Sequence, residues 1–198
     1  MLNKTIIFLV RHGQTEWNLQ NRFQGHKNSP LTTKGIEQAL QVKKSLSQYE
    51  IHKAYVSPLK RAKDTINIIL NGREIKIIQK NNLKEINLGP WEGKTREEME
   101  KSHPYEYNQF WNNQDKFFLS GAETYQQLQN RVVMELNNIF QKEQNKSILV
   151  VSHWIAIKVA IAYYASIPIS KLSSLTDIGN GKFLTLVSEN GNVAINNF

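Results

Sequence analysis

The sequence predicts an α/β fold in which helices cover both faces of a largely parallel sheet. Short apolar segments alternate along the chain with longer segments whose apolar residues recur at helical spacing, a pattern typical of parallel sheets. The chain has 198 residues and no Pro/Gly-rich linker, which favours a single domain over residues 1–198. Three apolar segments lead into arginine or histidine, and we expect the ligand there, because parallel sheets bind ligands at the carboxyl ends of their strands.

Five elements are expected in the first part of the chain. They are a strand over residues 5–10, a helix from 31–32 to about 48, a strand over 53–57, a helix over 59–70 and a strand over 74–78. In the first of these helices, apolar residues at helical spacing predict the buried face: Ile36, Ala39, Leu40, Val42 and Leu46.

Residues 83–120 are less regular, with Gly89, Pro90, Gly93 and Pro104 among them. We expect loops and short helices here that lie over the strand ends as a lid. The aromatic residues of this segment are expected to form the core of the lid: Trp91, Tyr105, Tyr107, Phe110, Trp111, Phe117 and Phe118.

The second half of the chain continues the alternation. Residues 120–123 (Ser-Gly-Ala-Glu) have the pattern of a capping box and are expected to open a long helix. Apolar spacing predicts its buried face: Tyr125, Leu128, Val132, Leu136 and Ile139. We expect residues 147–152 as the central strand, 154–165 as a helix, and 182–188 with 192–196 as a closing hairpin.

The composition excludes several kinds of site. There is no cysteine, so disulfides, thiol nucleophiles and thiolate metal sites are excluded.

Lys and Arg number 25 against 17 Asp and Glu, and the net charge of +8 suits nucleic acid, anionic lipid or a phosphorylated substrate. The basic residues form no run typical of a nucleic-acid arm. With neither a signal-peptide pattern nor an apolar stretch long enough for a bilayer, we expect a cytoplasmic protein without nucleic-acid or membrane partners.

Residues 8–13 (Phe-Leu-Val-Arg-His-Gly) are the most informative stretch, because an apolar strand ends on Arg11 and His12. Burying such groups unpaired is costly, and two later apolar segments lead in the same way to Arg61 and His153. Arginine binds phosphoryl oxygens bidentately, and a cationic histidine binds another. A neutral histidine can instead attack phosphorus and carry the group. The pattern therefore indicates phosphoryl chemistry.

A leaving alkoxide needs a proton, which requires a carboxylic acid near the phosphate. Glu85 is the candidate, since it ends a short apolar segment before Gly89. Glu92, Glu97 and Glu98 are nearby alternatives, but they fall in a charged stretch that we expect to be exposed.

Residues 9–18 (LVRHGQTEWN) resemble the signature of the histidine phosphatase superfamily, the phosphoglycerate-mutase-like proteins. Further blocks match in the family's order, at residues 22–25, 30–32 with Gly35, 57–62, 121–124 and 151–153. The first block alone is fairly specific for this superfamily. The ordered set of blocks spans most of the chain and is strongly specific for it.

The resemblance implies a three-layer α/β/α sandwich and a phosphohistidine mechanism. It implies His12 as the nucleophile and Glu85 as the acid that protonates the leaving group and then activates water. Other positions are implied to complete the phosphate pocket or to line its mouth: Arg11, Arg61, His153, Asn18, Gln24 and Gly25. It implies no metal or organic cofactor, because arginine and histidine supply the charge stabilisation.

The chain departs from the family pattern at two positions. Trp154 stands where glycine commonly follows the second histidine. Its indole either narrows the pocket or offers a flat face to the substrate, or else it packs into the start of the helix. Asn28 stands where an acidic residue is common, and we expect it to change surface charge more than chemistry. His26 is expected either to touch substrate or to lie on the surface, and His52 and His103 are expected on the surface.

The residues around the acid distinguish a phosphatase from a mutase. Residues 85–93 (EINLGPWEG) resemble the phosphatase branch, whereas the family's mutases tend to be longer and place their glutamate in a Glu-Arg-His-Tyr-Gly-like setting. We therefore expect metal-independent hydrolysis of a small phosphorylated metabolite, with inorganic phosphate as the product. A cofactor-dependent phosphoglycerate mutase and a catalytically weak regulatory protein that binds phospho-ligands stay open as alternatives. The oligomeric state is also open and includes a homodimer.

Overall fold

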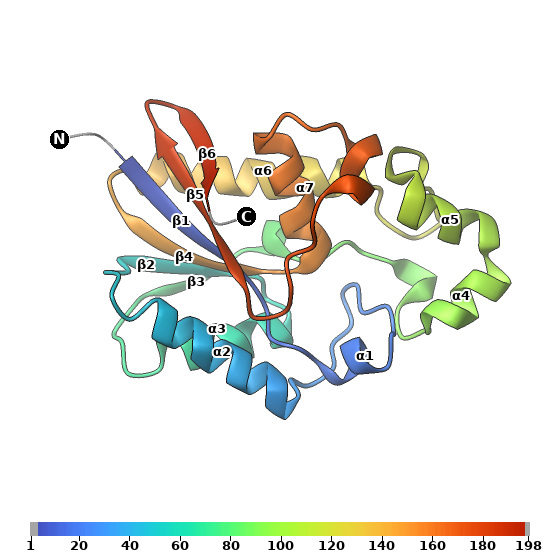
Figure 1. Cartoon of the computed structure of the whole chain (residues 1–198), viewed down its shortest axis with the longest axis horizontal. Coiled ribbons are helices and arrows are strands. Elements are labelled where there is room, and N and C mark those ends of the chain that lie inside the picture. The colour runs from blue at the N-terminus through green and yellow to red at the C-terminus, as the bar shows by residue number, and fades with distance from the viewer. Residues whose placement is uncertain (1–3, 197–198) are drawn as a thin grey trace.

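A computed structural model describes residues 4–196 and places six strands in one sheet (Figure 1). The strands are β1 (Lys4–Arg11), β2 (Lys53–Val56), β3 (Ile77–Gln79), β4 (Ser147–Ser152), β5 (Phe183–Glu189) and β6 (Asn192–Asn196). Their order across the sheet is β3-β2-β4-β1-β5-β6. β1, β4, β2 and β3 pair in parallel, whereas β5 is antiparallel to both of its neighbours. The predicted, mostly parallel sheet is confirmed, with β4 inside it.

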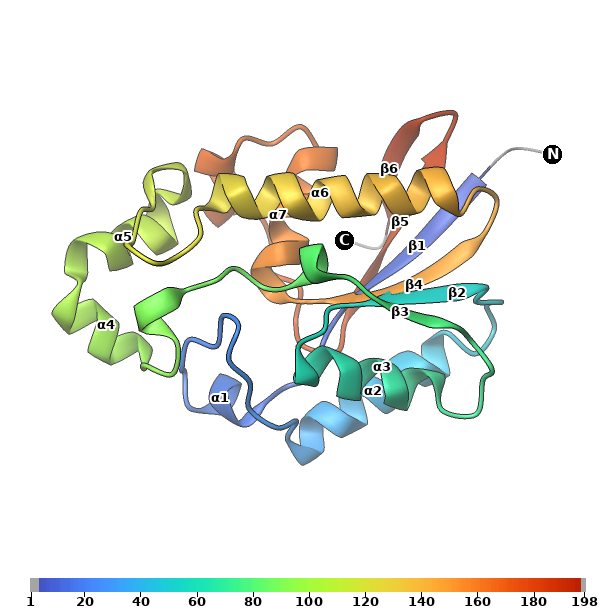
Figure 2. The same cartoon turned by 180° about the vertical axis from the view of Figure 1, so that it is seen from behind.

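Helices cover both faces of the sheet and make the predicted three layers (Figure 2). They are α2 (Thr33–Ser45) and α3 (Lys60–Leu70) on one face, and α6 (Tyr125–Lys142) and α7 (Trp154–Tyr164) on the other. Along β1, Phe8 and Val10 pack into the hydrophobic cluster of α2 and α3. Ile7 and Leu9 pack into the cluster of α6 and α7. The strand is apolar at successive positions because both of its faces are buried.

The segment between β3 and α6 extends past the carboxyl ends of the parallel strands (Figure 2). It contains the expected short helices, which are η1 (Asn81–Leu83), η2 (Gly89–Trp91), α4 (Arg96–Ser102), α5 (Pro104–Asn112) and η3 (Gln114–Lys116). Two more short elements lie elsewhere in the chain, α1 (Glu16–Leu19) and η4 (Ile169–Ser174).

Aromatic side chains form the core of this segment, as predicted, but two of the seven do not take part. Trp91, Phe110 and Phe117 are buried, and their ring centroids lie 5.2–5.8 Å apart. Tyr107 and Trp111 pack against the same cluster. Tyr105 and Phe118 are 70% and 69% exposed, so the prediction that they belong to the core is wrong. Tyr105 lies at the start of the short helix α5 and Phe118 lies in the loop after η3, where no periodic pattern indicates burial.

The capping box expected at residues 120–123 is wrong, because α6 begins at Tyr125. Its N-cap is Thr124, whose hydroxyl accepts from the amide of Gln127, while the side chain of Gln127 accepts from the amide of Thr124. The sequence contains both patterns, and the one adjoining the apolar face forms the cap. Glu123 is used elsewhere, in an ion pair with Arg131.

Two further elements differ from their expected bounds. β3 covers Ile77–Gln79 instead of 74–78, because the residues before it form a turn in which the amide of Ile75 donates to the carbonyl of Arg73. α2 ends at Ser45, three residues earlier than expected. Within it, Ile36 and Leu40 are 43% and 49% exposed, so the buried face of the helix is narrower than the predicted one. The other helices and strands lie within one residue of their expected bounds.

Candidate active site

The carboxyl ends of neighbouring strands bring the predicted basic residues together. β1 pairs in parallel with β4 as far as Arg11 and Ser152. The next residues along each strand, His12 and His153, therefore lie side by side, with ring centroids 5.1 Å apart. The backbone amide of His12 donates to the carbonyl of Ser152 at 3.1 Å, which extends the strand pairing by one more bond. Parallel pairing thus places both imidazoles at one edge of the sheet.

The hydrogen bonds of His12 indicate which ring nitrogen carries the proton. Nδ1 lies 2.8 Å from the carbonyl oxygen of Gly13, which only accepts, so Nδ1 is the protonated nitrogen. Nε2 lies 3.2 Å from Nε of Arg61, which only donates, so Nε2 bears the lone pair. A nitrogen with a free lone pair is what a nucleophilic histidine requires.

Two glycines let the chain after β1 pass directly against the start of α2. A Cβ on Gly13 would collide with the carbonyl oxygen of Gly35, and a Cβ on Gly35 would collide with the carbonyl oxygen of Gln14. Thr65 of α3 holds the same turn, because its hydroxyl accepts from the amide of Gly13 at 3.0 Å. This close approach fixes the backbone that carries His12.

Arg61, which is 1% exposed, joins His12 to the loop before α2. Its Nη1 donates to the carbonyl of Lys27 at 2.7 Å, and its Nη2 donates to the carbonyl of Gly25 at 2.8 Å. Nη1 also lies 3.2 Å from Oδ1 of Asn28. Asn28 was expected to change surface charge more than chemistry, but the structure makes it a partner of this buried guanidinium. Arg61 therefore positions both His12 and the loop.

The carboxylate of Glu85 lies at the N-terminus of α7. Its oxygens accept hydrogen bonds from the amides of Ile155 and Ala156, each at 3.1 Å, and Oε1 also accepts from the amide of Ile86 at 3.0 Å. The amides of a first helical turn have no partner within the helix, and the helix dipole favours a negative group there. Glu85 is therefore held beside the helix that begins directly after His153.

Arg131 and His26 hold the backbone of Glu85. Nη2 of Arg131 lies 2.8 Å and Nε2 of His26 lies 2.9 Å from the carbonyl oxygen of Glu85. An ion pair with Glu123, in which Nε and Oε1 are 2.6 Å apart, fixes the guanidinium of Arg131 in turn. Arg131 and Glu123 were not among the predicted site residues, because neither follows a strand. His26 was expected at the substrate or on the surface, and the structure instead has it partly buried against this carbonyl.

The alternative carboxylates have structural roles. Glu92 accepts from the backbone amides of residues 26 and 27, at 2.7 Å and 3.1 Å. Glu98 completes the capping box of α4, and Glu97 pairs with a lysine one turn further along that helix. Glu85 is thus the one of the four glutamates that lines the cavity where the site residues converge.

That cavity has a volume of about 80 Å³ and lies at the carboxyl ends of β1 and β4. Eight of the nine residues predicted for the site line it: Arg11, His12, Asn18, Gln24, Gly25, Arg61, Glu85 and Trp154. His153 does not line it, because its side chain is fully buried with Nε2 2.7 Å from the hydroxyl of Ser57. Its Nδ1 is buried without a hydrogen-bond partner among the described residues.

Several residues that line the cavity were not predicted for the site. They include Arg22, Phe23, Arg96, Phe110 and Trp111. The guanidinium of Arg96 lies 4.7 Å from the ring centroid of Trp111, and that of Arg11 lies 5.6 Å from the ring centroid of Trp154. Four arginines and one carboxylate line the cavity, so its field favours an anion.

Burial and neighbouring charges set the protonation of the site. Burial first, and then the charges of Arg61 and Arg11, hold the pKa of His12 well below its usual 6.5. Burial, Arg61 and His12 lower the pKa of His153 in the same way. Burial also lowers the pKa of Arg11 and of Arg61 to about 10, so both stay charged at neutral pH. The site therefore combines neutral imidazoles with cationic guanidiniums.

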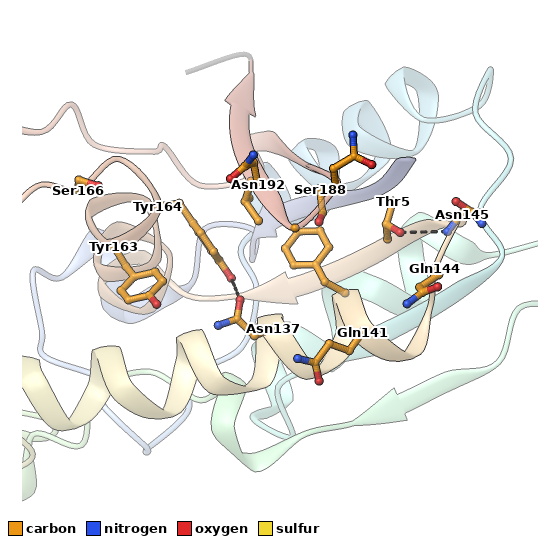
Figure 3. A pocket seen from close by; sticks show the side chains of 14 residues that line it. Thr5, Asn137, Gln141, Gln144, Asn145, Tyr163, Tyr164, Ser166, Ser188 and Asn192 are labelled. Carbon is orange, nitrogen blue, oxygen red and sulfur yellow. Dashed lines mark hydrogen bonds between the residues drawn. The ribbon is translucent and has the colours of Figure 1, made fainter. Parts of the chain in front are cut away.

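A larger hollow, of about 860 Å³, lies near the opposite end of the sheet (Figure 3). It is bounded by the ends of α6 and α7 and by the β5–β6 hairpin, and Asn137, Gln141 and Tyr164 are among its residues. None of the 14 residues that line it is charged. This hollow therefore lacks the groups that neutralise a phosphate or transfer its protons.

Two other features, a metal site and a membrane-spanning helix, are absent from the described residues. Among residues 4–196, no three His, Cys, Asp or Glu side chains gather as a metal site requires. In the same residues, no helix combines the length and the apolar character needed to cross a membrane. His52 is exposed as expected, whereas His103 is partly buried, with its ring centroid 6.1 Å from that of Trp91.

Comparison with known proteins agrees with the geometry of the site. A family model described as histidine phosphatase superfamily (branch 1) matches residues 7–198. A relative named phosphoserine phosphatase 1, from Hydrogenobacter thermophilus, is 29% identical over 168 residues, which are 85% of this chain and 80% of that protein. A relative named probable phosphoglycerate mutase GpmB, from Salmonella choleraesuis, is 32% identical over 162 residues, 82% of this chain and 75% of that protein. The solved structure of Bacillus stearothermophilus YhfR has a TM-score of 0.95 and 31% identity, and the match covers 96% of this chain and 95% of that one.

Proposed function

The chain belongs to the histidine phosphatase superfamily, and on that premise we propose that it hydrolyses small phosphomonoesters, without a metal ion, through a phosphohistidine at His12. The observation that carries the proposal is the unprotonated Nε2 of His12. His12 lines a cavity together with four arginines. Relatives named as a phosphatase and as a mutase both support phosphoryl transfer as the class of reaction.

In the first half-reaction, Nε2 of His12 attacks phosphorus. The N–P bond forms while the P–O bond to the leaving group breaks, and Glu85, as the carboxylic acid, gives its proton to the departing oxygen. Nδ1 of His12 keeps its proton, and the carbonyl of Gly13 stabilises the positive charge that the ring acquires. Arg11 and Arg61 stabilise the charge on the phosphoryl oxygens, which is where such catalysis gains most.

In the second half-reaction, water attacks the phosphorus of the phosphohistidine. Glu85, now a carboxylate, takes a proton from the water while the N–P bond breaks. Inorganic phosphate leaves, and both His12 and Glu85 return to their starting forms. We propose that His153 donates a hydrogen bond from Nδ1 to a phosphoryl oxygen, because this nitrogen is buried beside His12 without a hydrogen-bond partner among the described residues.

Hydrolysis is favoured over a mutase reaction by the residues that follow Glu85, which resemble the phosphatase branch. A mutase has to keep water away from its phosphorylated histidine while the substrate turns over. The 32% identical relative named as a probable mutase keeps this reaction as the second candidate. We propose a small phosphorylated metabolite as the substrate, such as phosphoserine or a phosphoglycerate.

Release of phosphate from p-nitrophenyl phosphate in the presence of EDTA tests the proposal. We expect steady turnover by the wild-type protein, none by His12→Ala, and unchanged turnover by the exposed control His52→Ala. A phosphohistidine peptide containing His12 should appear after rapid quenching in base, since this adduct is labile to acid. Interconversion of 3- and 2-phosphoglycerate that depends on the bisphosphate, with no net phosphate release, would establish the mutase reaction instead.

A further inference from the structure

Four residues form a partition between the catalytic cavity and a second hollow. Phe110, Trp111, Trp154 and Ile155 line the catalytic cavity of about 80 Å³, and the same four line a neighbouring hollow of about 280 Å³. The other residues of that hollow come from α5, η3, α6, α7, η4 and the segment after η4, and they include Lys158 of α7. The space beyond the partition is thus more than three times the space within it.

Two of the four residues lie at the edge of the main hydrophobic cluster, and two belong to its core. Phe110 and Ile155 are 1% and 5% exposed and belong to the main hydrophobic cluster. Trp111 and Trp154 are only partly buried and pack on the outside of that cluster. Their indole Nε1 atoms are both buried without a hydrogen-bond partner among the described residues. The two indoles therefore occupy this place without any polar bond that specifies it.

A stack of rings and cations holds the two indoles in place. The ring centroids of Trp111 and Trp154 are 5.7 Å apart with 38° between their planes. The guanidinium of Arg11 lies 5.6 Å from the ring of Trp154, and that of Arg96 lies 4.7 Å from the ring of Trp111. Such cation–π contacts stabilise an aromatic ring in one position. The stack thus runs from a phosphate-pocket arginine at the end of β1 to the first residue of α4.

We propose that the Trp111–Trp154 pair sets the upper size limit of the leaving group that the active site accepts. The inference rests on the proposed phosphatase function, because it concerns the group that Glu85 protonates. With both indoles in place, the space beside the phosphate admits only a small leaving group. Removing either indole joins the cavity to the neighbouring hollow, which has room for a bulky group. A pocket of this kind discriminates between substrates by the size of the leaving group, because a group too large for the space does not fit.

The test compares phenyl phosphate with 2-naphthyl phosphate, whose leaving groups have similar basicity but different size. We expect wild-type kcat/KM to favour phenyl phosphate by about tenfold or more. In Trp111→Ala and in Trp154→Ala, the ratio of the two kcat/KM values should move toward one. The ratio is the readout because losing Trp154 also removes a contact of Arg11, which changes the rate with both substrates alike.

Matched controls use exposed aromatic residues on the same helices. Tyr105→Ala on α5 and Tyr163→Ala on α7 should leave the ratio at its wild-type value. Trp111→Leu and Trp154→Leu provide smaller changes should the alanine variants fail to fold. An unchanged ratio in folded variants of both tryptophans would overturn the proposal. So would equal wild-type kcat/KM for the two esters, which needs no variant at all. A wild-type protein that releases no phosphate from phenyl phosphate would instead contradict the phosphatase function.

Discussion

Nε of Arg61 lies 3.2 Å from Nε2 of His12, so a buried guanidinium holds the nitrogen proposed as the nucleophile in its unprotonated form. The same side chain binds the carbonyls of Gly25 and Lys27. One residue thus sets the protonation of His12, its orientation and the loop beside it. In the proposed reaction, a phosphate that enters the cavity therefore meets an unprotonated Nε2.

Replacing Arg61 with lysine should lower kcat by about 100-fold or more, although the charge is kept. Lysine carries a single ammonium group and cannot bond His12, Gly25 and Lys27 in the planar arrangement that the structure uses. Steady-state kinetics with p-nitrophenyl phosphate measures the loss, and circular dichroism checks the fold. The neighbouring, exposed Lys60→Arg is the control. A kcat for Arg61→Lys within threefold of wild type would show that the charge alone suffices.

The buried histidines predict how stability depends on pH. His12 and His153 have pKa values well below 6.5 in the folded protein, because burial and neighbouring cations disfavour their charged forms. In the unfolded chain both titrate near the usual 6.5. Below that pH the unfolded chain binds protons that the folded protein does not bind. The stability present above pH 6.5 is therefore lost as the pH falls.

Each of the two histidines should contribute a slope of about 1.4 kcal/mol per pH unit below pH 6. Urea denaturation at pH 7.5, 6.0 and 5.0 measures the free energy of unfolding. The variant His153→Gln should show a shallower fall than the wild type, while the exposed-site variant His52→Gln should follow the wild type. Parallel curves for wild type and His153→Gln would mean that His153 is protonated in the folded protein.

The site residues at the strand ends could be predicted from the sequence, because each directly follows an apolar segment along the chain. Arg11, His12 and His153 each follow an apolar run, and parallel pairing alone brings such residues to one edge of the sheet. Arg96 and Trp111 could not be found in this way. They lie in the irregular segment 83–120, where no period fixes which side chains face the cavity.

Competing local signals explain the other differences between sequence and structure. Two consecutive capping patterns stand at the start of α6, at residues 120–123 and 124–127, and only the packing of the apolar face of the helix selects Thr124. In α2, Ile36 and Leu40 have the spacing of a buried face, but both are exposed in the structure because only part of the predicted apolar face packs against the sheet. Asn28 stands out in the sequence as a departure from the family pattern, but its contact with Arg61 could not be predicted, because it joins residues 33 positions apart.

Replacing Glu85 with glutamine should lower activity in a way that depends on the leaving group. Glutamine cannot give up a proton, so hydrolysis of an alkyl phosphate such as phosphoserine should fall by about 100-fold or more. Hydrolysis of p-nitrophenyl phosphate should fall much less, since p-nitrophenolate leaves without a proton. The ratio of the two kcat values measures the effect. Equal losses with both substrates would assign Glu85 to positioning only, through its bonds to the amides of Ile155 and Ala156.

A methyl group on Gly35 should destabilise the protein by about 1–3 kcal/mol or more, because it overpacks a closed contact. The new Cβ would collide with the backbone carbonyl of Gln14, which cannot move aside as a flexible side chain would. Relief would require the turn that holds His12 to shift, so Gly35→Ala should also lose activity in the fraction that folds. Urea denaturation and kinetics measure the two effects. Gly179→Ala is the control, since its Cβ would meet only the side chain of Lys182 at an ordinary 3.5 Å. Wild-type stability in Gly35→Ala would mean that the turn and α2 can separate without disturbing the nucleophile.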